Sequence, residues 1–356
     1  MPLIQWVINM LDRITDRNQQ SGDEWESGDF TFRPKRFEDF LGQDKVKERL
    51  KIAIEAARSR GEVIEHVLLS GPQGLGKSTL ANIIAHEMGT NIKTTVGPAL
   101  TMKADLAAIL TNLQHGDVLF IDEIHRIKND IQETLYPAME DYRLDLIIGQ
   151  GPSARIIPFP LPKFILIGAT TRMGQLSAPF RDRFGITLRL DFYDIAQLKE
   201  IIKRDTALLK IEIMDDGADE LIARRSRGTP RVAKRMLRRI RDYAKVKGDG
   251  RITEKITQEA FKFYEVDELG LEDMDRKILQ TIIEKFDGGP VGLETIAVSM
   301  SEEVCTIEDA HEPYLIQVGF IKRTRTGRVA TKLAYEHIGL KPPAKQQDLW
   351  DFVDET

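Results

Sequence analysis

The sequence predicts an α/β fold: a phosphate-loop NTPase domain with a mostly parallel sheet, then a small helical domain and a C-terminal winged-helix domain. Three observations support this prediction. Apolar runs of strand length at 66–70, 118–122 and 164–171 alternate with helical patterns, as in a parallel sheet covered on both faces. After 188–192, strand signals nearly vanish and three successive helical patterns follow. From about residue 272, three more helical patterns precede a basic, hairpin-like segment, which is typical of a winged helix.

Length and composition place the chain among globular proteins with several domains. It has 356 residues, 42% of them hydrophobic, which is enough for two or three cores. Its one cysteine, Cys305, cannot form an internal disulfide, and no apolar run approaches the roughly 18 residues of a membrane span. The apolar start of the chain lacks the basic leading segment of an export signal. We therefore expect a cytoplasmic protein without membrane attachment.

Changes of pattern along the chain give the expected domain boundaries. A polar, acidic stretch before the first domain is typical of a linker. We expect an N-terminal extension and linker (1–30), a large ATPase domain (31–192), a small helical domain (193–266), a winged helix (267–340) and a tail (341–356).

The large domain is expected to open with an amphipathic helix. Val46, Leu50, Ile54 and Ala57 share one face of a 3.6-residue period, and Gly61 is a typical helix stop. The apolar run at 66–70 follows as the first strand.

Gly71–Ser78, GPQGLGKS, fits the phosphate-loop pattern G-x-x-x-x-G-K-[ST] between a strand and an amphipathic helix. Glycines permit the turns that aim successive backbone N–H groups at phosphate oxygens, and the helix adds the positive end of its dipole. Lys77 would reach the β and γ phosphates, and Ser78 would ligate Mg²⁺. The alternative is a flexible loop before a helix, but the strand and helix on either side favour binding of ATP or ADP with Mg²⁺.

Two consecutive acids, Asp122 and Glu123, close the second apolar run. Asp122 is placed to hold the magnesium shell, often through water. Glu123 could accept a proton from the attacking water or orient it. Such pairs are also ordinary surface residues, and only the phosphate loop makes hydrolysis the favoured interpretation.

Two basic segments contrast with the net charge of −5, which gives no overall sign of nucleic-acid binding. Residues 224–241 hold nine basic side chains and no acid, and residues 321–332 hold five and no acid. Either segment could attract phosphate locally, because screening confines the interaction to roughly 10 Å. For 224–241 we favour a nucleotide-contacting arginine, solvated positions and subunit contacts over a DNA patch.

The motifs GPQGLGKS, LFIDEIHR, GATTR, RDRFG and GTPR, in this order, resemble those of the AAA+ ATPases. GGPVGLETIA and HEPYLIQVGFIKRT are more specific and resemble the bacterial Holliday-junction branch-migration motors within that group. The resemblance runs from about residue 32 to 340. It implies that the small helical domain is the lid over the nucleotide, and we call it the lid domain below.

The resemblance implies roles that spacing alone does not assign. Thr171 is similar to the sensor that contacts the γ-phosphate or the water; the alternative is a strand-end hydroxyl that caps the backbone. Arg183 is similar to the arginine finger that enters a neighbouring subunit's site, with Arg181 as the rival. Arg231 is similar to the second sensor, which reaches the nucleotide from the lid.

Further nucleotide contacts follow from the same resemblance. Gln73 departs from the usual proline, and Ser78 replaces the usual threonine but keeps the hydroxyl that a metal needs. Phe32 stands where an aliphatic residue is more usual. The positions that the resemblance assigns to nucleotide binding, beside Lys77, Ser78 and Arg231, are Phe32, Arg33, Gly74, Leu75, Gly76, Thr79, Glu140, Asp141, Tyr142 and Tyr193.

The resemblance also implies contacts with DNA and protein. Arg323 and Arg328 are similar to residues that contact DNA phosphates, whereas Val304 stands where some relatives have another arginine. Two extended apolar segments around a Gly-Pro turn, at 144–162, predict a hairpin inserted in the large domain. It resembles the element that docks a junction-binding partner protein; packing on the sheet is the alternative for its side chains Leu146, Ile148 and Ile156.

The motifs predict an ATP-hydrolysing enzyme, and the resemblance implies a hexameric ring that drives branch migration of Holliday junctions in recombination and DNA repair. Its expected partners are four-way junction arms and duplex DNA, other copies of the chain, the junction-binding protein and a resolvase. One alternative is another AAA+ machine such as a clamp loader, which the basic wing argues against. The other is a nucleotide-switched DNA-binding regulator that does not move along DNA.

Overall fold

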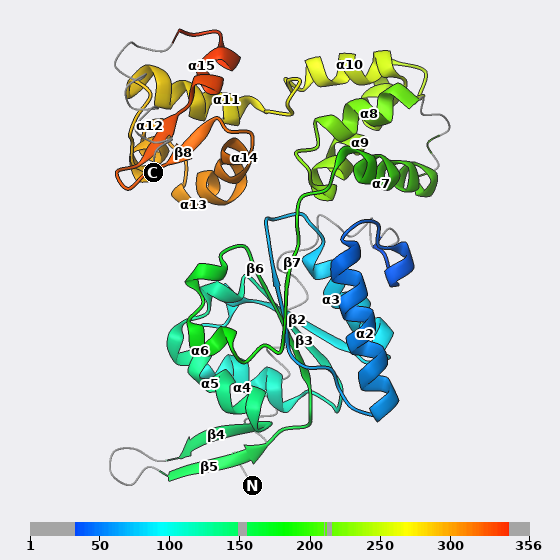
Figure 1. Cartoon of the computed structure of the whole chain (residues 1–356), viewed down its shortest axis with the longest axis vertical. Helices are drawn as coiled ribbons and strands as arrows, with labels where there is room; N and C mark the ends of the chain where they lie inside the picture. Colours follow the sequence, from blue (N-terminus) through cyan, green and yellow to red (C-terminus); the bar gives the residue numbers. More distant parts are fainter. Residues whose placement is uncertain (1–32, 149–154, 210, 212–215, 342–356) are drawn as a thin grey trace. The chain divides into compact units, whose positions relative to one another are not determined.

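The computed structural model describes residues 33–148, 155–209, 211 and 216–341 (Figure 1). These residues form two compact units. The first comprises the described residues up to Gly71 and those from Leu75 to Asp191; the second comprises Pro72–Gly74 and the described residues from Phe192 onward. Phe32 lies outside the described residues. Among the described residues, no helix combines the length and the apolar character that a membrane crossing requires.

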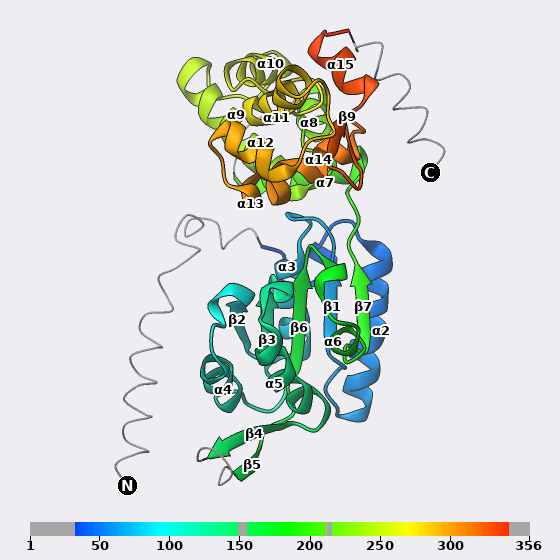
Figure 2. The same ribbon diagram turned by 90° about the vertical axis from the view of Figure 1, so that its left-hand side faces the viewer.

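A parallel sheet forms the centre of the first unit. Its described strands lie in the order β2, β3, β6, β1, β7, which Figure 2 shows side by side. Every neighbouring pair is parallel. The bounds are β1 (Val67–Ser70), β2 (Ile92–Val96), β3 (Val118–Asp122), β6 (Ile165–Thr170) and β7 (Ile186–Arg189). The three apolar runs are therefore strands, as predicted, and the predicted parallel α/β sheet is confirmed.

Helices cover both faces of this sheet (Figure 1). On one face lie α2 (Asp44–Arg60) and α3 (Lys77–Met88); on the other lie α4 (Lys103–Thr111), α5 (Asn129–Glu140) and α6 (Ala178–Arg181). The apolar face predicted for the first helix is buried in α2, which ends at a left-handed glycine, Gly61. Leu106, Leu135 and Phe180 from the second layer share one core with β3 and β6.

The predicted hairpin is present as an antiparallel pair, β4 (Arg143–Ile148) and β5 (Arg155–Pro160). In Figure 2 it lies at the end of the sheet opposite the start of α3. Ile157 and Phe159 on β5 are 47% and 41% exposed. Leu146, Ile148 and Ile156 lie on the two strands, but their side chains fall outside the described residues.

The described residues in the first part of the second unit fold mainly into helices. Its lid part contains α7 (Ile195–Leu208), α8 (Asp216–Arg224), α9 (Pro230–Lys247) and α10 (Glu254–Phe263). The first three were expected. The fourth, α10, was not predicted; its N-cap is Thr253, whose hydroxyl accepts a hydrogen bond from the Ile256 N–H.

The rest of the second unit is a winged helix with its own core, built around Ile278, Ile296, Leu315 and Tyr335. It contains the three predicted helical segments, the last of them divided into two helices, and the predicted basic two-stranded wing; the helix after the wing was not predicted. Its elements are α11 (Asp273–Gln280), α12 (Leu293–Met300), α13 (Val304–Thr306), α14 (Glu312–Gln317), β8 (Ile321–Arg323), β9 (Arg328–Ala330) and α15 (Lys332–Ile338).

Candidate functional site

Several predicted catalytic residues meet at one edge of the sheet. The carboxyl ends of parallel strands lie at the same edge, which is where ligands bind in such sheets. The phosphate loop follows β1, Asp122 closes β3, and Thr171 follows β6, which lies between those two strands. Topology thus places the candidate sensor between the loop and the acidic pair.

The phosphate loop has the backbone that its glycines allow. Gly71 and Gly76 have φ values of 137° and 99°, and a Cβ on Gly71 would lie 2.5 Å from the Leu190 carbonyl oxygen. Lys77 begins α3 and is 8% exposed, and its Nζ donates to the Gly71 carbonyl at 2.7 Å. Ser78 is partly buried in the first turn of the same helix. The N–H groups of a helix's first turn favour an anion.

The acidic pair is held by its own backbone. One oxygen of Asp122, Oδ1, accepts the Glu123 N–H at 2.9 Å. Glu123 has φ +47°, a left-handed conformation that costs a non-glycine residue roughly 1–3 kcal/mol and is concentrated at functional sites. Its carboxylate pairs with Arg126, with 2.9 Å between Nη1 and Oε2.

The end of β6 carries two threonines with different surroundings. Thr170 is fully buried; its hydroxyl lies 3.0 Å from His125 Nδ1 and accepts the Arg172 N–H at 2.9 Å. Thr171 is the next residue and is only partly buried. Thr170 thus makes a backbone contact of the kind considered for Thr171.

Four other predicted residues lie at the opposite edge of the sheet. Ile186, the first residue of β7, pairs with Val67, the first residue of β1, so Arg183 precedes the amino ends of the strands. Glu140 ends α5, and Asp141 and Tyr142 follow it near the same ends. At about 3.3 Å per residue, the four residues of β1 alone separate the two edges by about 13 Å. The structure thus separates the phosphate loop from four predicted residues of the same chain: Arg183, Glu140, Asp141 and Tyr142.

A buried histidine, His66, holds the end of α5 at the amino ends of the strands. No sequence pattern pointed to this residue. His66 Nδ1 accepts the Leu166 N–H at 2.9 Å, so Nε2 carries the proton that it shares with the Met139 carbonyl at 3.1 Å. Burial lowers the pKa of His66, which keeps the ring neutral. The ring of Tyr142 packs at 6.3 Å from it. The end of α5 is thereby tied to β1 and β6.

Arg183 is held in place by its own chain. Its Nε lies 3.2 Å from Glu140 Oε1, and its Nη1 donates to the Pro179 carbonyl at 2.5 Å. The guanidinium carbon lies 4.1 Å from the centre of the Tyr136 ring. Its side chain is 22% exposed. Arg183 and Glu140, predicted separately, therefore form one cluster.

The lid supplies two further predicted residues. Tyr193 is buried, and its N–H donates to the Gly228 carbonyl at 2.9 Å. Arg231 is exposed in the first turn of α9, and its N–H lies 3.3 Å from the Gly74 carbonyl oxygen at the tip of the phosphate loop. Arg33 is partly buried near the start of the described chain.

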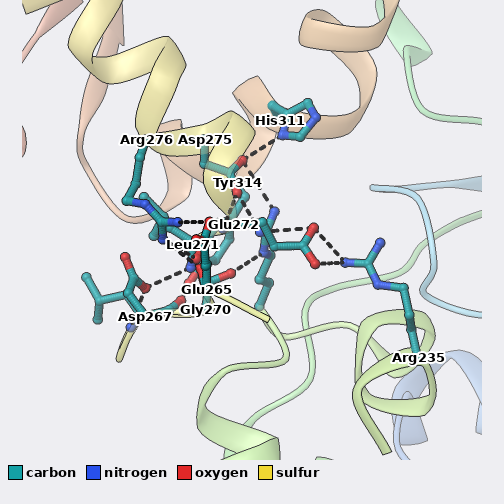
Figure 3. Close-up of polar contacts among 12 residues, drawn as sticks. Arg235, Glu265, Asp267, Gly270, Leu271, Glu272, Asp275, Arg276, His311 and Tyr314 are labelled. Atoms are coloured by element: carbon teal, nitrogen blue, oxygen red, sulfur yellow. Dashed lines mark hydrogen bonds and ion pairs between the residues drawn. The ribbon is translucent and has the colours of Figure 1, made fainter. Parts of the chain in front are cut away.

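The basic segment 224–241 makes contacts that the sequence did not reveal. Arg227 Nη2 lies 2.5 Å from Oδ2 of Asp275, a fully buried residue of α11. Arg235 and Arg239 pair with Glu272 at 3.1 Å and 2.8 Å. Figure 3 shows Glu272 facing Arg235, and Asp275 facing His311. Part of this charge therefore joins the lid to the winged helix, a contact that our interpretation of the segment did not include.

Asp275 is the centre of this lid–winged-helix contact. His311 Nδ1 lies 2.7 Å from its Oδ1. Burial would raise the pKa of Asp275, but the hydrogen bond with His311 and the charge of Arg227 outweigh burial and hold the pKa below its usual value. The carboxylate is thus ionised at neutral pH and stabilises the folded state while it stays ionised.

We expect Asp275→Asn to lower the free energy of unfolding of the second unit by about 3 kcal/mol, because it leaves buried Arg227 with only the more distant carboxylate of Glu272, at 3.9 Å, as counter-charge. The native pKa is below that of the unfolded chain, so this stability is present above roughly pH 4 and is lost as pH falls through the native value. Urea unfolding followed by circular dichroism should show the difference at pH 7 and its decline as the pH falls below roughly 4. Asp273→Asn on the same helix, whose side chain is 54% exposed, should cost less than about 1 kcal/mol; an equal loss in both variants would contradict the prediction.

The wing carries the predicted DNA-binding arginines. Arg323 on β8 and Arg328 on β9 are direct partners in the antiparallel register. Both guanidinium groups bond to Glu312, the first residue of α14. Val304 begins α13 in the same domain.

Three family models, all of RuvB domains, match consecutive regions of the chain. Residues 32–190 match the Holliday junction DNA helicase RuvB P-loop domain. Residues 193–267 match the RuvB AAA lid domain, and residues 268–339 match the RuvB C-terminal winged helix domain.

Solved structures of RuvB from Thermotoga maritima agree with these matches. One, described as the Holliday junction branch migration motor, is 50% identical, with a TM-score of 0.79 over 88% of this chain and 99% of its own. A point variant of the same protein is 49% identical, with a TM-score of 0.81 over 88% of this chain and 100% of its own. At this identity and coverage, the chain belongs to the RuvB family.

Proposed function

We propose that the chain is an ATP-hydrolysing DNA motor that assembles into a hexameric ring and drives branch migration of Holliday junctions. The observation that carries this proposal is the meeting of Lys77, Asp122 and Thr171 at one edge of the sheet of a RuvB-family chain. The family membership supports the DNA substrate, and the wing supplies a surface for it.

In the proposed site, the loop amides and Lys77 hold the β and γ phosphates. Ser78 and Asp122 would hold Mg²⁺, which when bound neutralises charge on the phosphates. Among the described residues, no three or more acidic, histidine or cysteine side chains form a cluster that could hold a metal ion. A site completed by phosphate oxygens needs no such cluster, since Mg²⁺ in these enzymes uses one or two protein ligands.

Glu123 is the proposed catalytic carboxylate. It follows Asp122 directly and orients the attacking water or accepts its proton. Thr171 is the proposed sensor of the γ-phosphate at the neighbouring strand end. Arg231 and Tyr193 are the proposed lid contacts, together with the loop residues Gly74, Leu75, Gly76 and Thr79 and with Phe32 and Arg33.

We further propose that each site is completed by the adjacent subunit. Arg183 lies at the edge of the sheet opposite the phosphate loop of its own chain, which supports a role at the nucleotide of another copy. The same placement applies to Glu140, Asp141 and Tyr142. Their predicted nucleotide contact is therefore proposed for the neighbour's ATP, and Arg181 remains the rival for the finger.

The DNA contacts proposed for Arg323 and Arg328 go to phosphates. Such contacts carry little sequence information, which suits a motor that acts on any sequence. The β4–β5 hairpin, with Ile157 and Phe159 exposed, is the proposed docking element for a junction-binding partner protein, and a resolvase is a further expected partner. We propose a cytoplasmic location for these reactions.

The test is ATP-dependent dissociation of a synthetic four-way junction, with and without the junction-binding partner. We expect the full chain to separate the arms only with ATP and Mg²⁺, and faster with the partner. Lys77→Ala, which lacks the phosphate-binding ammonium, should be inactive. A chain that binds the junction under nucleotide control but never separates its arms would instead be the switched regulator.

A further inference from the structure

The HEPY segment, His311–Tyr314, is specific to this chain's family resemblance, yet the proposed function assigns it no role. Its carboxylate, Glu312, is 1% exposed. Charged side chains are seldom this deeply buried unless they are paired. The partners of Glu312 are the two wing arginines proposed to contact DNA.

The pairing has a regular geometry. Arg323 donates from Nε to Oε1 at 2.9 Å and from Nη2 to Oε2 at 2.5 Å. Arg328 donates from Nε to the same Oε1 at 2.8 Å and from Nη2 to the same Oε2 at 3.2 Å. Both guanidinium groups therefore present the same edge to one carboxylate. The Nη1 groups take no part in these four bonds.

Charge explains why a buried acid is needed here. Arg323 and Arg328 are opposite each other across the two strands, and like charges in that position repel. Glu312 lies between them, and Glu308 lies 3.8 Å from Arg323. Burial would raise the pKa of Glu312, but hydrogen bonds from Arg323 and Arg328 outweigh it and lower the pKa, so the carboxylate stays ionised.

The exposure of the two arginines fits a contact made by their outer ends. The side chain of Arg323 is 52% exposed and that of Arg328 is 19% exposed. Arginine binds phosphate best as a planar fork with a fixed orientation. An arginine already held on one edge loses less side-chain freedom when the phosphate binds.

We propose that Glu312 is a positioning residue for DNA binding: it holds Arg323 and Arg328 side by side so that both Nη1 ends face one stretch of DNA backbone. This proposal rests on the proposed function, which makes the two arginines phosphate contacts. The competing account is that Glu312 only neutralises positive charge. The two accounts predict opposite signs, because removal of a merely neutralising acid would strengthen DNA binding.

The test is Glu312→Gln in the full chain, with binding to a fluorescent duplex followed by anisotropy at several salt concentrations. We expect roughly tenfold weaker binding at moderate salt and a shallower dependence of log K on log salt, by about one unit, because a loss of one phosphate contact lowers that slope by about 0.9. Glu294→Gln removes the same charge from an exposed position in the same domain and should bind as tightly as wild type or slightly tighter. DNA-independent ATP turnover of each variant checks that the chain is folded.

Each outcome separates the proposals. If the wild-type chain binds DNA and Glu312→Gln binds it equally or more tightly, the positioning role is overturned and the proposed function stays intact. A wild-type chain that binds neither duplex nor junction would overturn the DNA role and this inference with it. If Glu312→Gln fails to fold, Arg328→Lys is the deciding variant. It keeps the positive charge but lacks the Nε and Nη2 edge that Glu312 holds, so we expect a similar loss of DNA affinity. Wild-type affinity in Arg328→Lys would refute the role of geometry.

Discussion

Arg183→Ala is expected to reduce ATP turnover by about 10³–10⁵-fold, the effect of removing an arginine finger in phosphate-loop enzymes. The guanidinium would stabilise charge on the transferring phosphoryl group of the neighbouring subunit's ATP. The variant should still bind ATP, because its own phosphate loop is unchanged. Steady-state turnover and nucleotide affinity, measured separately, check both parts.

The location of Arg183 makes a mixing experiment decisive. An Arg183→Ala subunit retains its phosphate loop, and a Lys77→Ala subunit retains its arginine. Mixed rings should therefore recover turnover at sites where the two meet, although each variant alone is inactive. Mixed rings without any recovery would contradict catalysis between subunits.

Controls for Arg183 come from its surroundings. Arg181→Ala removes the rival arginine two residues away and should leave turnover within a few-fold of wild type. Loss of the pair with Glu140, whose side chain is 56% exposed, should cost at most about 1 kcal/mol of stability. A large fall in thermal stability of Arg183→Ala would point to a structural role.

Glu123→Gln is expected to slow ATP hydrolysis by about 10²–10⁴-fold, the usual contribution of a positioned general base. The amide has nearly the same shape but cannot accept the water's proton. ATP should still bind, because Lys77 and Ser78 are unaffected, so the variant should hold ATP without turning it over. Phosphate release and ATP binding measure the two properties.

The matched control is Glu133→Gln, an exposed carboxylate on α5 in the same domain. It should turn over ATP at the wild-type rate. If Glu123→Gln also keeps that rate, Glu123 is not the catalytic carboxylate and another group must orient the water. Arg126→Ala is a further check, because it removes the arginine that pairs with Glu123 but leaves the carboxylate in place. It tests whether hydrolysis depends on the carboxylate or on the ion pair.

Sequence patterns predicted most of the elements near the nucleotide because those signals are local. The run at 118–122 is a strand with the same bounds in the structure, since continuous apolar residues suit a sheet covered on both faces. β2 was missed because Ile92–Val96 is an edge strand with polar, exposed positions and no apolar run. α10 was missed although its N-cap threonine was a usable signal.

The sequence by itself determined the phosphate loop, the acidic pair, the parallel α/β sheet and the basic wing, because each depends on neighbouring residues and their spacing. Only the tertiary structure decided that Arg183 and Glu140 share the edge opposite the loop, that Arg227 binds Asp275, and that Glu312 lies between the wing arginines. These pairs join residues that are 11 to 48 positions apart and lie on separate elements or loops. Their meeting depends on strand order and packing, which no local pattern of residues encodes.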